Sequence, residues 1–257
     1  AGCAAFLSNC FACGYFFVLL FLKRKNTYVA ISPKALRFER AIVLGVCAVG
    51  IPASIQNLLN VTGMTVLNNF TSAYGADAVA AMGIAQKVNM VPMQVALGFS
   101  QGIMPLISYN YGSGNSRRMK DVFFFSSRIS LGISATVTLI YFFGAQGVVS
   151  LFMENPAIVA YGSRFLQGMC LGLPFLCMDF LAVGVFQSCG MGGKALAFAI
   201  LRKIVLEIPA LCILGSLFPL YGLAYAQFTA EVVLATAAVL VLARLFRGLE
   251  KRESPLA

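Results

Sequence analysis

The chain has 257 residues, of which 60% are hydrophobic and only 11% are charged, and its mean hydropathy is +0.85. This composition excludes a water-soluble globular domain, because a fold of this size has too little interior to cover so much apolar surface. Its sequence has no histidine, which removes the commonest general base and metal ligand, so we predict no enzyme, no metal site and no cofactor.

The remaining possibility is an all-α integral membrane protein with about seven transmembrane helices. A hydrocarbon core about 30 Å thick takes roughly 20 apolar helical residues per crossing. Seven such stretches follow one another: 3–22, 43–70, 78–109, 122–152, 158–187, 195–217 and 220–243. Several hold an internal proline, which predicts a kink or a local break; these prolines are Pro52, Pro92, Pro105, Pro174 and Pro209.

The first stretch, 1–22, begins without a methionine in the middle of an apolar run. We expect it to be the last helix of a preceding lobe whose sequence lies upstream. Residues 23–42 form a long polar stretch, which predicts a cytoplasmic linker that ends in an interfacial amphipathic helix. The six later stretches then form a lobe of their own over 43–247, and 248–257 form a cytoplasmic tail.

Lysine and arginine gather in every second connection and at the C-terminus. These residues are Lys23, Arg24, Lys25, Lys34, Arg37, Arg40, Arg117, Arg118, Lys120, Lys194, Arg202, Lys203, Arg244, Arg247, Lys251 and Arg252. The alternate connections, near 71–77, 153–157 and 218–221, hold none. Since positive residues collect on the cytoplasmic side, we predict a multi-pass protein of the plasma membrane with a cytoplasmic C-terminus. The net charge of +10 then reflects basic residues that mark the cytoplasmic side of the membrane, and we predict no nucleic-acid binding.

A few polar side chains fall inside the predicted spans, where a charge near the midplane costs at least about 2.5 to 3.5 kcal/mol. Three are carboxylates on the last three spans, one is a lysine on the third span, and the others are amides. The candidate cation-coupling or substrate-binding residues are Asp179, Glu207, Glu231, Lys87, Gln56, Asn60 and Gln94. The alternative is that these groups only satisfy one another and join helices together.

The three acids allow two interpretations. Asp179 is a lone acid in an apolar span, and we expect a proton or a partner to neutralise it. Glu207 and Glu231 lie equally far from the turn between the last two spans, which predicts a common depth. They form either a shared carboxylate site, at a level that Lys87 also reaches, or two separate pairs. In the second case Glu207 pairs with Lys203, four residues before it, and Glu231 bonds a neighbouring helix.

The sequence offers a poor match to a nucleotide-binding loop. The run Gly192-Gly193-Lys194 has Ser188 where such a loop needs its first glycine, and Ala195 where it needs serine or threonine. An ion gradient is the remaining source of energy, since a membrane potential supplies about 2.3 kcal/mol per charge per 100 mV.

Several short motifs are similar, in their order and spacing, to the multidrug and toxic compound extrusion (MATE) family of transporters, aligned to its sixth to twelfth helices. The similarity covers essentially the whole chain. It rests on Gly50-Ile51-Pro52, Ala78-Val79-Ala80-Ala81-Met82-Gly83, Gln101-Gly102-Ile103-Met104-Pro105, Asn110-Tyr111-Gly112-Ser113-Gly114-Asn115 with Arg117-Arg118, Gly172-Leu173-Pro174 and Phe186-Gln187-Ser188-Cys189-Gly190-Met191-Gly192.

The resemblance implies twelve helices in two six-helix lobes, of which this chain holds the C-terminal lobe and the helix before it. It further implies export of small organic cations or drugs by antiport with protons or sodium, in contact with membrane lipid and with an N-terminal lobe. Some branches of the family have an acid on the seventh helix, where this chain has Asn60, and Asp179 lies in the helix of the family's other acidic position. A further branch uses an aspartate on the first helix.

Two other functions remain open at this point. One is a flippase for lipid-linked precursors or a polysaccharide exporter of the same superfamily, which a cavity rich in arginine and lysine would favour. The other is a seven-helix receptor, which the number of spans alone suggests.

Overall fold

The computed structural model describes residues 2–23, 39–218 and 220–253, and within these ranges all regular structure is helical. The chain divides into two compact units, 1–46 and 47–257. The helices are α1 (Gly2–Leu22), α2 (Arg40–Ser72), α3 (Ala76–Gly112), α4 (Ser116–Ser150), α5 (Pro156–Cys170), α6 (Leu173–Ser188), α7 (Gly192–Ile200), the π-helix η2 (Leu201–Glu207), α8 (Ile208–Leu217) and α9 (Gly222–Glu253). Most of the predicted linker 23–42 lies outside the described residues.

Each predicted span coincides with a helix or with a chain of helices. Five helices of the described part are long and apolar enough to cross a membrane: α1, α2, α3, α4 and α9. The stretch 158–187 is a bent pair, because α5 and α6 meet at 45° next to Pro174. The stretch 195–217 runs through α7, η2 and α8, and Pro209 is the second residue of α8. Pro52, Pro92 and Pro105 remain inside continuous helices.

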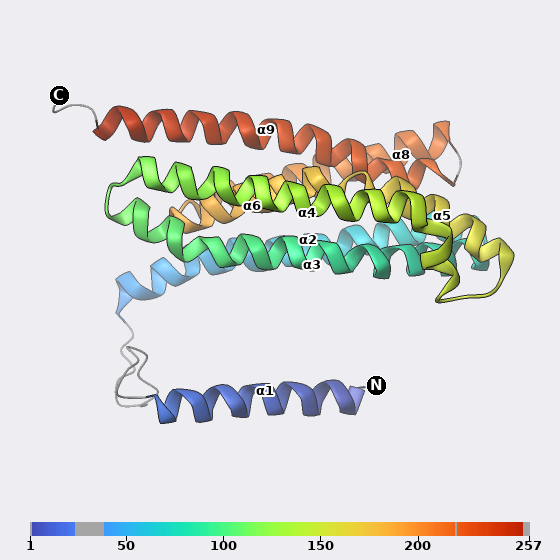
Figure 1. Cartoon of the computed structure of the whole chain (residues 1–257), viewed down its shortest axis with the longest axis horizontal. Helices are drawn as coiled ribbons and strands as arrows, with labels where there is room; N and C mark the ends of the chain where they lie inside the picture. Colours follow the sequence, from blue (N-terminus) through green and yellow to red (C-terminus); the bar gives the residue numbers. More distant parts are fainter. Residues whose placement is uncertain (1, 24–38, 219, 254–257) are drawn as a thin grey trace. The chain divides into compact units, whose positions relative to one another are not determined.

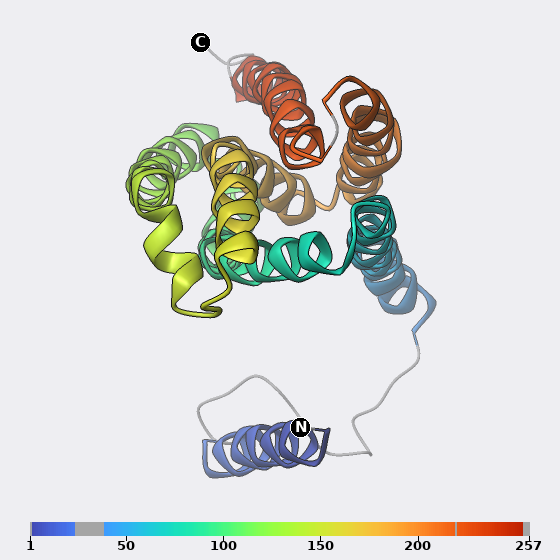
Figure 2. The ribbon, with the colours of Figure 1, turned by 90° about the vertical axis from the view of Figure 1, so that its right-hand side faces the viewer.

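The second unit is a bundle whose long helices run roughly side by side (Figure 1). α3 packs against α4, α5 and α6, while α9 packs against α6 and α8 (Figure 2). One group of buried side chains fills the end that contains Met82, Phe165 and Leu223. Another fills the opposite end around Phe123 and Phe186.

Close helix contacts depend on small residues. Gly184 of α6 lies against Ser100 of α3, whose hydroxyl donates a hydrogen bond of 2.7 Å to the Phe180 carbonyl. Gly168 of α5 lies against Ala224 of α9, so that a Cβ at residue 168 would be 2.9 Å from the Ala224 Cβ. Small residues at such crossings let two helices approach closely in a membrane.

The basic turns of the second unit share one end of the bundle. The end of α3, the start of α4, the end of α6, α7 and the end of α9 meet in one buried cluster that includes Ile107, Met119, Phe186, Phe198 and Phe246. The turns 113–115 and 189–191 and the end of α9 therefore lie together (Figure 1). The exposed basic residues at this end are Arg117, Arg118, Lys194, Arg244 and Arg247.

Two residues of the predicted basic connections were assigned wrongly. Arg202 and Lys203 are buried inside the bundle, in η2, and belong to no connection. The basic asymmetry remains without them, because Lys194 still marks the turn after α6.

We predict that the turn 113–115 and the turn at 73–75 face opposite sides of the membrane, since only the first belongs to the basic end. In a chain whose exposed native cysteines are replaced by serine, Ser113→Cys and Ala73→Cys should react with a membrane-impermeant maleimide from opposite sides of sealed vesicles. Labelling of both from the same side would contradict this topology.

We also predict that Gly168→Ala destabilises the lobe by about 1 to 3 kcal/mol, because the added methyl group overpacks the contact with Ala224. Gly132→Ala in α4 is the matched control, since a Cβ there meets nothing within 4 Å and alanine favours the helix. Thermal unfolding of the purified protein measures both. An equal midpoint for the two variants would show that the contact between α5 and α9 is not tight.

Candidate functional site

Five charged side chains lie buried together in the second unit. Their exposed fractions are 2% for Asp179 in α6, 4%, 8% and 6% for Arg202, Lys203 and Glu207 in η2, and 0% for Glu231 in α9. Removing an ion from water costs several kcal/mol, so each charge requires a close partner of opposite sign. We call these five residues the buried network.

Arg202 connects the carboxylates of two other helices. Its Nε lies 2.9 Å from Glu231 Oε1, and its Nη1 lies 3.5 Å from Asp179 Oδ2. The first contact is close but its hydrogen-bond angle is poor, so it is an ion pair rather than a well-aligned hydrogen bond. The guanidinium carbon also lies 5.4 Å from the centre of the Phe180 ring, at the range of a cation–π interaction.

Lys203 and Glu207 form a second, local pair. Lys203 Nζ donates hydrogen bonds of 2.7 and 2.6 Å to the two carboxylate oxygens of Glu207, one turn further along. The lysine side chain fits because Gly63 of α2 has no side chain, and a Cβ there would be 3.0 Å from Lys203 Nζ. This pair is the one that the second interpretation of the acids predicts.

The π-helix η2 carries three of the five charged residues of the buried network. In η2 the Ile208 N–H donates to the Lys203 carbonyl, five residues back. Pro209 follows, and it has no N–H to offer to the carbonyl four residues before it. A short π-helix widens the turn at this point, and such segments occur frequently at functional sites. Arg202, Lys203 and Glu207 all lie within it.

The network carries one more negative group than positive groups. Its three carboxylates face two cations, and Lys203 neutralises Glu207. Asp179 and Glu231 then share Arg202. Among the described residues, Asp179 Oδ1 and Glu231 Oε2 are buried without a hydrogen-bond partner. The surplus charge therefore falls on Asp179 and Glu231, where one proton or one monovalent cation would balance it.

The other predicted site residues lie outside the buried network. Gln56 is half-buried in α2 and accepts a hydrogen bond of 3.5 Å from the side chain of Gln187 in α6. Asn60 is half-buried one turn further along α2. Lys87 and Gln94 are exposed on α3. Among the described residues, Lys87 thus makes no hydrogen bond or ion pair with the two glutamates whose depth it was expected to share.

Arg202 was not among the predicted site residues, although it makes the central contact. A signal for it exists in the sequence, because Arg202 lies well inside the apolar run 195–217, where a charge requires a buried partner. Its partners, however, lie 23 residues before it and 29 residues after it, so neither is a neighbour along the helix.

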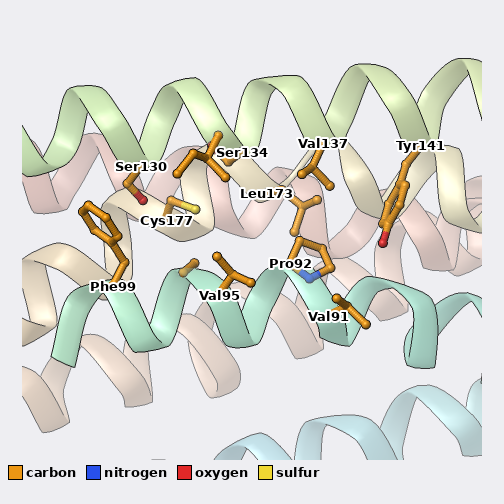
Figure 3. Close-up of a pocket in the computed structure, with 12 residues that line it drawn as sticks. Val91, Pro92, Val95, Phe99, Ser130, Ser134, Val137, Tyr141, Leu173 and Cys177 are labelled. Carbon is orange, nitrogen blue, oxygen red and sulfur yellow. The ribbon is translucent and has the colours of Figure 1, made fainter. Parts of the chain in front are cut away.

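A cavity of about 120 Å³ lies between α3, α4 and α6 (Figure 3). Most of its wall is apolar, with Val95, Phe99 and Leu173 among the lining residues. Its polar side chains include Ser130 and Cys177, which lie near each other in the close-up. None of the lining residues that the structure describes is charged, although Cys177 lies two residues before Asp179 of the buried network on α6.

Comparison with known proteins gives a consistent family. The sequence matches the MatE family over residues 52–213. The multidrug export protein MepA of Staphylococcus haemolyticus is 34% identical over 239 residues, which are 91% of this chain and 51% of that protein. MepA of Staphylococcus saprophyticus is 32% identical, over 88% of this chain and 49% of its own length. The chain thus spans about half the length of the curated relatives that it matches.

Solved structures show the same fold. A multidrug resistance MATE family transporter of the MOP superfamily in its outward-facing conformation matches with a TM-score of 0.85 and 22% identity, over 92% of this chain and 54% of that chain. The Vibrio cholerae MATE transporter VcmN in the bent form matches with a TM-score of 0.80 and 17% identity, over 88% and 52%.

We predict that Arg202→Gln destabilises the protein by about 3 to 5 kcal/mol, because it leaves Asp179 and Glu231 buried without a cation. Adding Glu231→Gln should recover part of that loss, since one of the two unpaired charges disappears. Thermal unfolding measures both variants. Arg164→Gln is the control, because this exposed arginine stacks on Tyr221 without a carboxylate partner among the described contacts. Equal losses for Arg202→Gln and Arg164→Gln would contradict the prediction.

Proposed function

The chain belongs to the MatE family, and from this premise we propose that it forms the C-terminal lobe of a secondary active exporter for organic cations or drugs. The relatives named above carry the description multidrug export protein. Those relatives favour neither a lipid-linked precursor flippase or polysaccharide exporter nor a seven-helix receptor. The partners that we propose are small organic cations, membrane lipid and an N-terminal lobe of the same protein.

The observation that carries this proposal is the surplus negative charge of the buried network. An exporter of this kind needs a group inside the membrane that takes up a cation on one side and releases it on the other. Asp179 and Glu231 share one arginine, so they are the groups whose charge state is least satisfied. We propose that they bind the coupling ion, a proton or sodium, and that Glu207 serves mainly to neutralise Lys203.

The substrate path is proposed to run along an exposed polar stripe on α3. Lys87, Gln94 and Gln101 are spaced seven residues apart, so they lie on one face of the helix. All three are exposed in this lobe. A lysine that faced lipid at this depth would be costly, which favours a position facing the N-terminal lobe and the water-filled space between the lobes. Gln56 and Asn60 on α2 are proposed to add polar contacts there.

We propose a plasma-membrane location with the basic end of the lobe, including the C-terminus, in the cytoplasm. The support is the asymmetry of Arg117, Arg118, Lys194, Arg244 and Arg247 at one end of the bundle.

Asp179→Asn in the full-length protein should abolish gradient-driven efflux while leaving expression and membrane insertion intact, because the amide is isosteric but cannot change charge. Asp77→Asn is the matched control, since Asp77 is exposed in the first turn of α3, away from the network. Efflux of ethidium from energised vesicles measures both. Undiminished efflux by Asp179→Asn would remove Asp179 from the coupling site.

A further inference from the structure

We infer that Arg202 determines the ion selectivity of the proposed exporter: its guanidinium acts as a built-in cation between Asp179 and Glu231, so that the site accepts a proton and excludes sodium. The inference rests on the proposed function, since selectivity applies only to a site that couples ion entry to export. It assigns to Arg202 a role in specificity.

The position that a sodium ion would need is already occupied by positive charge. A metal ion shared by the two carboxylates would lie beside a guanidinium that contacts Glu231 at 2.9 Å and Asp179 at 3.5 Å. Arginine does not lose its proton in proteins, so this charge cannot be switched off. Repulsion between like charges is strong in a buried site of low dielectric constant. A proton avoids the conflict, because it adds to a carboxylate oxygen and neutralises that group.

The two acids have oxygens that a proton can bind. A proton needs a single oxygen, and Asp179 Oδ1 and Glu231 Oε2 are both buried and without a hydrogen bond among the described residues.

The charged groups around Asp179 and Glu231 indicate that the site takes up a single proton. α6 supplies Asp179 and the Cys177 thiol, η2 supplies Arg202, Lys203 and Glu207, and α9 supplies Glu231. Lys203 and Glu207 already neutralise each other through two short hydrogen bonds. The Cys177 thiol in turn lies beside the hydroxyls of Ser130 and Ser134 on α4. One proton on Asp179 or Glu231 therefore leaves Arg202 paired with a single remaining carboxylate.

This charge change has a structural consequence. With both acids ionised, Arg202 ties η2 to α6 and to α9. Protonation of either acid weakens one of these two ties and leaves the other. The proton thus biases the packing of η2 between α6 and α9, which is the differential interaction that a conformational switch requires.

The first test uses the full-length protein in liposomes loaded with ethidium. A pH gradient alone should drive ethidium transport, and a sodium gradient alone, at equal pH on both sides, should not. Transport driven by sodium would overturn the inference and leave the proposed function standing. Transport driven by neither gradient would overturn the proposed function, and the inference with it.

The second test addresses Arg202 itself through thermal unfolding of the purified full-length protein in sodium chloride and in choline chloride. The native protein and the control Arg164→Gln should have the same midpoint in both salts. The unfolding midpoint of Arg202→Gln should be higher in sodium chloride than in choline chloride, because the two carboxylates are then free to bind the sodium ion. Absence of that shift in a folded Arg202→Gln protein, or an equal shift in the native protein, would overturn the inference.

A third variant covers the case in which Arg202→Gln does not fold. Arg202→Lys keeps the positive charge but loses the planar fork that reaches two carboxylates. It should remain insensitive to sodium and should retain some pH-driven transport. Sodium-driven transport by Arg202→Lys would show that charge at this position does not exclude the metal ion.

Discussion

The contact of one guanidinium with two carboxylates is the constraint on which the rest of the lobe depends. Arg202 joins three helices that are distant in sequence, and each of its two partners is almost fully buried. A buried ion pair adds little stability compared with apolar side chains of similar size. Removing one partner is strongly destabilising, however, because the remaining ion is still desolvated and has lost its partner. The ion pairs of Arg202 therefore fix the positions of α6, η2 and α9 relative to one another around the buried network. The apolar clusters at the two ends of the bundle hold these helices by packing.

The two helices that carry most of the network are also the irregular ones. α6 begins just before Pro174, at a 45° bend five residues before Asp179. The π-helix η2 holds Arg202 and ends two residues before Pro209. Missing backbone hydrogen bonds make such points easier to bend than a continuous helix. A change of charge in the network thus acts on α6 and η2, which bend more easily than a regular helix. α4 has no internal proline and is stiffer.

The fold was largely predictable because a bilayer leaves an apolar chain few choices. A run of about 20 apolar residues in lipid satisfies its backbone only as a helix. Five of the seven predicted stretches coincide with single helices, one with the bent pair α5 and α6, and one with the run of α7, η2 and α8. The Lys203 and Glu207 pair was predictable from its spacing of four residues. Arg202 was not, because counting basic residues along the sequence does not tell a cytoplasmic charge from one paired with acids on other helices. That distinction depends on tertiary packing, which also left Lys87 outside the network.

The exposed stripe on α3 and the buried network are physically connected. Ser100 of α3 donates a hydrogen bond to the carbonyl of Phe180, the residue next to Asp179, and Ser108 donates to the Ser188 carbonyl at the end of α6. Gly184 keeps the two helices close enough for the first of these bonds. If the lobe works as proposed, a shift of α6 after Asp179 changes charge moves the backbone to which α3 is bonded. Gln94 and Gln101, on either side of Ser100 in sequence, would move with it, and substrate contact on the stripe would respond to the proton without any direct contact between the two sites.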